Sequence, residues 1–342
     1  MLDTQKLTQV MLHDAHGREF SYLRLSVTDV CNFRCNYCLP DGYECDKSAA
    51  EQPLTLSEIE QLVTLFAQKG IRKVRITGGE PSLRKDLPAI IKTVKNIAGI
   101  EKVALTTNGY KLSEKIQSYV DAGLDALNVS IDSLDPQVFH TITGHNRLQE
   151  VLNGIEKAQT LGLSSVKVNA VLLKSYNLNQ FETFLNWIKQ QNISLRFIEL
   201  METGDNKDYF NANHVSGASI QKRLLDLGWV EKIRGKDAGP AKEYEHPDYA
   251  GSLGLIMPYS KDFCKSCNRL RISSLGKLHL CLFGESGYDL RHFLQPDKVT
   301  IEDHEHAQLD AYLDNILQIK KQGHDLEHNQ TGSMRHLAML GG

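Results

Sequence analysis

The chain has few cysteines, no strong excess of charge and no long apolar run. Seven cysteines among 342 residues are too few for a disulfide framework, and no secretory signal precedes them. A net charge of −3 gives no support for a role in binding nucleic acid or a membrane surface. No segment approaches the length of a membrane-spanning helix. These absences predict a cytoplasmic protein of a reducing compartment, with no nucleic-acid or membrane partner.

Between about residues 22 and 200, short β-branched runs alternate with amphipathic stretches of helical period. The expected strands are Tyr22–Val27, Lys73–Thr77, Lys102–Thr107, Ala126–Ile131, Val166–Leu173 and Ser194–Leu200. The expected helices are Ser57–Lys69, Leu87–Ile97, Ser113–Ala122, Gln149–Leu161 and Leu178–Lys189. Six strands in series with helices between them predict parallel pairing with right-handed crossovers. The fold class is therefore α/β, either barrel-like or doubly wound.

The α/β rhythm fades after about residue 200. We therefore expect an N-terminal extension at 1–20, an α/β unit at 21–202 and a C-terminal domain at 203–342. The stretch from 203 to 263 looks irregular, with one helix at Gly217–Leu227. Further on, two strand-like runs flank a turn at Leu275-Gly276, which predicts a hairpin.

The first cysteine triplet, Cys31, Cys35 and Cys38, has the spacing C-x3-C-x2-C and directly follows the first expected strand. Three close thiolates can hold three irons of a [4Fe–4S] cluster and leave the fourth iron open for chemistry. The alternative is half of a structural zinc site, since spacing alone counts ligands and does not identify the metal.

The second cysteine triplet, Cys264, Cys267 and Cys281, has the spacing C-x2-C-x13-C, and the predicted hairpin brings its third member back to the first two. A second open cluster or a zinc site with His279 as fourth ligand would both fit. Arg269 and Arg271 share one strand face, where two guanidinium groups could clamp a polyphosphate. On their own, they could equally be a solvated hairpin edge.

Polar residues also gather on the strands and at their carboxyl ends, where α/β folds place their sites. Thr106, Ser130 and Met201 have ordinary structural explanations when taken singly. Arg75 and Lys167 say more, because a cation in an apolar strand is costly unless it meets an anion. We favour a ligand over a buried ion pair for both.

The first triplet, the aromatic residue before its third cysteine, and the segment Gly78-Gly79-Glu80-Pro81 resemble the radical S-adenosylmethionine (SAM) superfamily. The resemblance implies a partial (β/α)6 TIM-like barrel, with a C-terminal extension that carries the second triplet. It also implies SAM as cofactor. The residues that would line the SAM site are Tyr37, Gly79, Ser130 and Met201.

The run Cys-x2-Cys-Asn-Arg-Leu-Arg, a later third cysteine and the Gly-Gly terminus resemble the molybdenum cofactor biosynthesis protein A family, the GTP 3',8-cyclases. This implies a radical SAM lyase with two [4Fe–4S] clusters that converts GTP to 3',8-cyclo-7,8-dihydro-GTP. The implied catalytic residues are Arg24, Lys167, Arg269, Arg271, Gly341 and Gly342. The implied GTP contacts are Arg24, Arg75, Thr106, Lys167, Arg269 and Arg271.

The resemblance further implies a reducing electron donor, a downstream cyclic pyranopterin monophosphate synthase and a possible homodimer. Leu340 stands where the family suggests isoleucine, a mild departure, and Cys45 belongs to neither triplet and is expected to be a free thiol. Two alternatives stay open. One is a radical SAM enzyme that modifies peptides and carries an auxiliary cluster, and the other is a non-enzymatic zinc or iron–sulfur protein.

Overall fold

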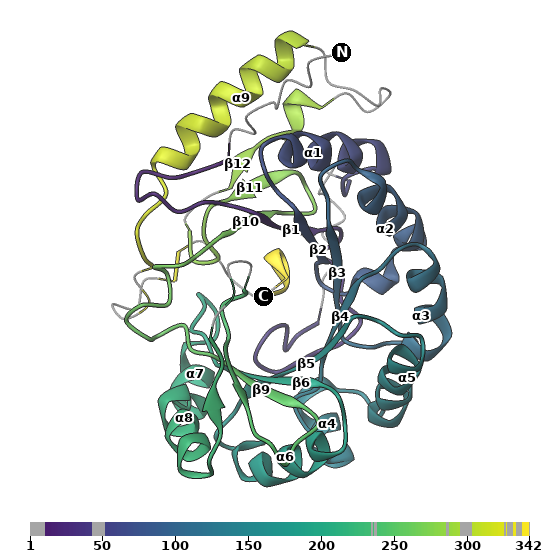
Figure 1. Cartoon of the computed structure of the whole chain (residues 1–342), viewed down its shortest axis with the longest axis vertical. Helices are drawn as coiled ribbons and strands as arrows, with labels where there is room; N and C mark the ends of the chain where they lie inside the picture. Colours follow the sequence, from purple (N-terminus) through teal and green to yellow (C-terminus); the bar gives the residue numbers. More distant parts are fainter. Residues whose placement is uncertain are drawn as a thin grey trace, which may run out of the picture.

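The computed structural model describes residues 11–42, 52–233, 235, 238–284, 287–294, 303–324, 326, 331–332 and 337–341. A twelve-stranded sheet, in the order β12-β11-β10-β1-β2-β3-β4-β5-β6-β9-β8-β7, curves into an open barrel (Figure 1). The six strands β1 to β6 run parallel to one another. They are β1 (Tyr22–Ser26), β2 (Lys73–Thr77), β3 (Lys102–Thr107), β4 (Ala126–Ser130), β5 (Ser165–Leu172) and β6 (Ser194–Glu199). Each predicted strand is confirmed, with its ends within one residue.

Helices cover the convex face of these strands (Figure 1). They are α1 (Leu56–Gln68), α2 (Leu87–Asn96), α3 (Leu112–Asp121), α4 (Pro136–Thr143), α5 (Leu148–Thr160) and α6 (Phe181–Lys189). Helix α1 starts with a capping box, in which Thr55 and Glu58 satisfy each other's backbone N–H groups. The sequence did not predict α4, an eight-residue helix that Asp135 caps and Pro136 begins. The expected helix at Leu178–Lys189 begins instead with a 3-10 turn, and α6 follows it.

The strands place an apolar core outside the barrel and polar side chains inside it. Along β5 the burial alternates, so that Val166 and Val168 pack toward the helices while Lys167 and Asn169 face the interior. Along β1 every residue is buried, and Tyr22 and Arg24 line the interior cavity. The parallel register therefore lines up inward side chains from neighbouring strands at matching heights.

The chain beyond residue 202 adds strands to both edges of this sheet. Strand β9 (Ser252–Ile256) pairs in parallel with β6, and β10 (Arg269–Ile272) pairs in parallel with β1. Antiparallel strands extend the edges: β7 (Val230–Glu231), β8 (Lys242–Glu245), β11 (Lys277–His279) and β12 (Tyr288–Asp289). The predicted hairpin is present as β10 and β11. The boundary at residue 202 stays a prediction.

The expectation of an irregular stretch from 203 to 263 is wrong. The one helix expected there, at Gly217–Leu227, is confirmed as α8 (Gly217–Asp226), but the stretch also contains α7 (Lys207–Asn213) and the strands β7, β8 and β9. Strand β9 is buried on both faces and contains Gly254, so it shows neither alternation nor strong strand propensity.

The C-terminal segment returns to the centre of the barrel. Helix α9 (Asp303–Gln318) lies outside the sheet, whereas the short turn Leu337–Leu340 lies inside the curve of the strands (Figure 1). Within the described ranges, no helix has the length and apolar character needed to cross a membrane.

Candidate functional site

The first cysteine triplet lies in the loop at the carboxyl end of β1. Cys31, Cys35 and Cys38 line one cavity, and the Cys38 N–H donates to the Cys35 carbonyl at 2.9 Å. The loop is fastened to the end of β2, because the Gly79 N–H donates to the Thr28 carbonyl at 2.8 Å. The N–H groups of Arg34 and Asn36 also donate to carbonyls at the end of α4, so the loop is held from both sides.

Glycine is required at the end of β2 because the cysteine loop passes so closely. A Cβ atom on Gly79 would lie 2.3 Å from the Val30 carbonyl oxygen, and one on Gly78 would lie 2.3 Å from that of Thr28. The resemblance to the radical SAM superfamily implies that Gly79 lines the SAM site, and this stays a prediction. The close approach that explains both glycines is made by the chain's own backbone.

Glu80, the polar residue of the segment Gly78-Gly79-Glu80-Pro81, is fully buried, and its carboxylate is hydrogen-bonded within the chain. Its carboxylate accepts from the Thr107 hydroxyl at 2.7 Å and from the Asn108 N–H at 2.6 Å. Burial raises the pKa of this carboxyl, although these hydrogen bonds oppose the shift. Glu80 therefore joins the ends of β2 and β3 beneath the cysteine loop.

The environment of the first triplet suits a metal cluster. Burial raises the pKa of Cys31 to about 11 and that of Cys38 to about 12. Burial, Asp132 and the neighbouring cysteines raise the pKa of Cys35 well above its usual range. Three soft thiolates fit an iron–sulfur cluster, whose irons would supply positive charge.

The residues predicted to bind SAM line the same cavity. They are Tyr37, Gly79, Ser130 and Met201. The Tyr37 hydroxyl donates to Asp132 at 2.9 Å, and the other oxygen of that carboxylate accepts from the Val171 N–H at 2.8 Å. Sequence reasoning quoted Asp132 at the end of its strand but gave it no role.

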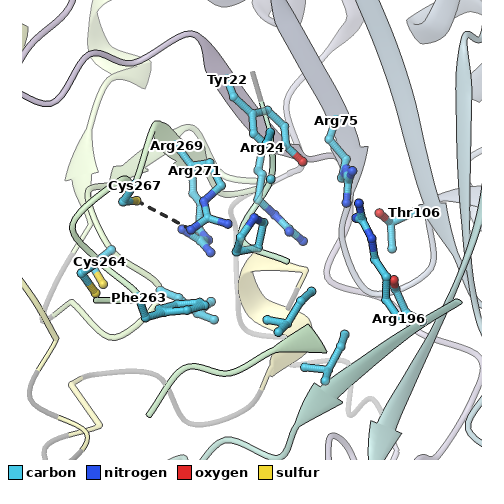
Figure 2. A pocket seen from close by; sticks show the side chains of 18 of the residues that line it. Tyr22, Arg24, Arg75, Thr106, Arg196, Phe263, Cys264, Cys267, Arg269 and Arg271 are labelled. Atoms are coloured by element: carbon cyan, nitrogen blue, oxygen red, sulfur yellow. Dashed lines mark hydrogen bonds between the residues drawn. The ribbon is translucent and has the colours of Figure 1, made fainter. Parts of the chain in front are cut away.

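The second cysteine triplet lies at the opposite end of the barrel. Cys264 and Cys267 precede β10, which runs parallel to β1, whereas the first triplet follows β1. They line a larger cavity together with Cys281, and the Arg269 guanidinium lies 3.9 Å from the Cys267 sulfur (Figure 2). Burial alone would raise the pKa of Cys267, but Arg269 and Lys320 lower it to about 7.

His279 does not line the cavity that this triplet lines. Its ring lies against Gly287, where an added Cβ atom would be 2.5 Å from Nε2. Within the described ranges, no group of three or more His, Cys, Asp or Glu side chains converges on a site for a single metal ion. Three thiolates beside a fixed arginine fit a second cluster.

Arginines from three adjacent strands form a row between the two triplets. Arg24 on β1 pairs in register with Arg271 on β10 and with Arg75 on β2. One level below, Tyr22 pairs with Arg269. Figure 2 shows these side chains pointing into one cavity of about 280 Å³, which lies between the curved sheet and the C-terminal segment.

This row is electrostatically costly without an anion. Burial and the neighbouring arginines lower the pKa of Arg24 to about 9. The Nε–H groups of Arg75, Arg269 and Arg271 are buried and have no hydrogen-bond acceptor among the described residues. The Thr106 hydroxyl is likewise buried and has no hydrogen-bond partner among the described residues. Buried donors of this kind call for an anionic ligand.

Lys167 lies on the far wall of the cavity beside two residues that sequence reasoning missed. Its Nζ is 3.8 Å from a Glu243 oxygen, which also accepts from Arg196 at 2.6 Å. Burial and Arg196 lower the pKa of Lys167 to about 7, against the opposing effect of Glu243. Arg196 carries the signal that picked out Arg75, a cation in an apolar strand, whereas Glu243 has no local signal.

The C-terminal tail closes the cavity from the side of the first triplet. The Gly341 carbonyl accepts a hydrogen bond from Arg24 and one from the Thr77 hydroxyl at 3.5 Å. Gly342 and Cys45 lie outside the described residues. Thr106, Asn169, Ile198 and Met201 line both cavities. A cofactor bound at the first triplet and an anion bound to the arginines would therefore occupy adjoining cavities.

Comparisons with known proteins agree with this arrangement. Residues 25–188 match the radical SAM superfamily, and residues 193–326 match the Molybdenum Cofactor Synthesis C family. A GTP 3',8-cyclase of Aeromonas hydrophila subsp. hydrophila is 55% identical over 334 residues, which span 97% of this chain and 96% of the relative. A GTP 3',8-cyclase of Tolumonas auensis is 53% identical over 333 residues, or 97% of each chain.

Solved structures share the fold at low identity. Streptococcus suis SuiB bound to S-adenosylmethionine has a TM-score of 0.59 at 14% identity, and the match covers 87% of this chain and 69% of SuiB. SuiB bound to its precursor peptide SuiA has a TM-score of 0.53 at 13% identity, with 96% and 76% covered. These matches establish the radical SAM fold alone.

Proposed function

This chain belongs to the GTP 3',8-cyclase family of the radical SAM superfamily, and from that premise we propose that it converts GTP to 3',8-cyclo-7,8-dihydro-GTP. That reaction is the first step of molybdenum cofactor biosynthesis. The observation that carries the proposal is the row formed by Arg271, Arg24 and Arg75 between two cysteine triplets. A triphosphate would neutralise this row, and the adjoining cavity would hold the cofactor that acts on the nucleotide.

The two triplets would each hold a [4Fe–4S] cluster. The first would use Cys31, Cys35 and Cys38, and SAM would bind beside it against Tyr37, Gly79, Ser130 and Met201. When bound there, SAM and the first cluster would supply one-electron chemistry: reductive cleavage of a carbon–sulfur bond of SAM, with release of methionine, and removal of the C3' hydrogen of GTP. Bonding of C3' to guanine C8 would then need one further electron and one proton to give the 7,8-dihydro product. The second cluster would use Cys264, Cys267 and Cys281, which line the same cavity as the arginines. The guanine of a bound GTP would lie beside these cysteines.

The chain's own residues bind, orient and enclose the substrate. Arg269, Arg271 and Arg75 would donate their unpaired Nε–H groups to phosphate oxygens. Lys167 would add a charge from the opposite wall. Arg24 holds the Gly341 carbonyl, so the tail would help to exclude water and to fix the nucleotide. Gly342, which lies outside the described residues, stays a predicted catalytic residue.

The proposal includes partners and a location. A strong one-electron donor would reduce the first cluster, and a cyclic pyranopterin monophosphate synthase would consume the product. We place both encounters in the cytoplasm and expect a homodimer.

An anaerobic assay tests the reaction. The reconstituted, reduced protein is incubated with SAM, with and without GTP, and 5'-deoxyadenosine and cyclised guanine product are measured. We expect GTP-dependent formation of both. Cys31→Ala should abolish both products and Cys281→Ala should abolish the cyclised product, whereas Cys45→Ala, which changes the cysteine outside both triplets, should keep both.

Two outcomes would contradict the proposal. SAM cleavage that is indifferent to GTP but rises with an added peptide would favour the peptide-modifying alternative. No SAM cleavage, with zinc bound at both triplets, would favour a non-enzymatic protein.

A further inference from the structure

Two buried cations from distant parts of the chain hold the second cysteine triplet. Arg18 precedes β1 and is 8% exposed, and Lys320 follows α9 and is 4% exposed. Neither was singled out by its sequence context. Both donate to backbone carbonyls of the segments that carry the cysteines, so their positions are fixed relative to the sulfur atoms.

Arg18 works as a backbone clamp. Its guanidinium donates to the Cys264 carbonyl at 3.2 Å, to the Gln322 carbonyl at 2.7 Å and to the Lys321 carbonyl at 2.7 Å. Asp14 accepts from its Nε at 2.6 Å, so a carboxylate balances the charge of Arg18. This clamp ties the cysteine segment to the chain that follows α9.

Lys320 has a different electrostatic partner. Its Nζ donates to the Leu280 carbonyl, next to Cys281, and lies 5.6 Å from the ring centroid of Phe20. In the described part of the chain, no carboxylate lies within ion-pair distance of this ammonium group. Burial lowers the pKa of Lys320, and the thiolates of Cys267 and Cys281 are the neighbours that oppose this shift. The contact with Leu280 places this ammonium group beside Cys281, so the cysteines are its neighbouring source of countercharge.

The position of Lys320 also separates it from the other cations near the triplet. Arg269 and Arg271 line the substrate cavity, so an anion bound there would compete with the cysteines for their charge. Lys320 does not line that cavity. A bound substrate would therefore not compete with the cysteines for the charge of Lys320.

We propose that Lys320 is the dedicated counter-ion of the second iron–sulfur cluster, a positioning residue that stabilises the cluster's reduced form. Reduction adds one negative charge to a cluster that already carries three cysteinates, so a buried cation beside it favours the reduced state and raises the reduction potential. The inference depends on the second cluster and not on the identity of the substrate.

Redox titration of the full-length protein tests this role. Cys31, Cys35 and Cys38 are replaced by serine, so that the electron paramagnetic resonance signal comes from the second cluster alone. Lys320→Met removes the charge and keeps most of the side-chain volume, and Lys321→Met changes the exposed neighbour as a matched control. We expect the midpoint potential to become more negative in Lys320→Met only, and Lys320→Arg to return it toward the parent value.

The outcomes decide between charge and packing. An equal midpoint potential in Lys320→Met and Lys321→Met would overturn the proposal. If Lys320→Met fails to retain iron, Lys320→Arg decides: recovered iron supports the role of the charge, and iron that stays absent shows a role of shape alone. Because no substrate is present, these readings do not depend on whether the protein cyclises GTP.

Discussion

Cys35 and Cys267 lie at opposite ends of one barrel, and their thiols meet opposite surroundings. Burial, Asp132 and Cys38 raise the pKa of Cys35 well above its usual range. Arg269 and Lys320 lower the pKa of Cys267 to about 7, although burial opposes them. Burial raises the pKa of Cys264 as well, so the two triplets differ at Cys267. There the protein itself supplies positive charge, through Arg269 and Lys320.

The two triplets also differ in how the chain assembles them. The first comes from one loop after β1, which the end of β2, the end of α4 and Tyr209 hold in place. The second combines a segment before β10, a strand end after β11 and the chain on either side, through Arg18 and Lys320. A substitution at the end of β2 should therefore reduce iron binding at the first triplet only. A substitution in the arginine row, in the middle of the barrel, should leave iron binding at both triplets unchanged.

Gly79→Ala should have the largest effect, and it should impair the first triplet without impairing the second. The added Cβ atom would lie 2.3 Å from the Val30 carbonyl oxygen, so the first cysteine loop must move. We expect SAM cleavage to fall by about 100-fold, as for a displacement of about 1 Å at a reacting centre. Iron held by the second triplet should remain. The measurements are 5'-deoxyadenosine formation and iron content per chain.

Gly235→Ala is the matched control, because nothing lies within 4 Å of its added Cβ atom. It should leave both measurements unchanged. Equal loss of iron from both triplets in Gly79→Ala would show that the two are not independent.

Arg75→Met tests the region between the two triplets and should impair GTP binding without impairing either triplet. Arg75 lies in the row between the triplets and has a buried Nε–H without an acceptor among the described residues. Losing its charged hydrogen bond should weaken GTP binding by about 10- to 100-fold, with iron content unchanged. Calorimetry measures the affinity, and Arg72→Met, at an exposed position, is the control. Wild-type affinity in Arg75→Met would remove Arg75 from the phosphate site.

The sequence predicts the strands β1 to β6 well because each is an apolar run between amphipathic helices. Cysteine spacing likewise identifies both triplets. Sequence reasoning failed where the signal is not local. Glu243 reaches Lys167 only because β8 pairs with β9 and β9 with β6, and no pattern around Glu243 indicates this.

Gly79 shows a second limit of sequence reasoning. A glycine permits a close approach, but the sequence does not say what approaches, and here the nearest group is the carbonyl of Val30. Lys320 shows the same limit, since burial next to cysteine sulfur depends on how the chain after α9 packs. The spacing of ligands can be read from a sequence, whereas the charges that surround them depend on tertiary contacts.

Lys167 should give the smallest effect, a dependence on pH. Burial and Arg196 lower its pKa to about 7, so part of the population loses the ammonium charge near neutral pH. A triphosphate binds the protonated form. GTP affinity should therefore fall as the pH rises above 7, by at most about 10-fold per pH unit for one proton. Titrations from pH 7 to 9 measure this slope, which Lys167→Met should lose.

The stability of the nucleotide-free protein should change in the opposite direction. The ordinary pKa of lysine is 10.5, so between about pH 7 and 10.5 the unfolded chain binds more protons at Lys167 than the folded chain does. The free energy of unfolding should therefore rise with pH across this window. Lys167→Met should flatten the rise, whereas Lys174→Met, at an exposed position, should keep it. The same slope in all three proteins would show that Lys167 is charged in the folded state, and its long ion pair with Glu243 would then be strong enough to offset burial.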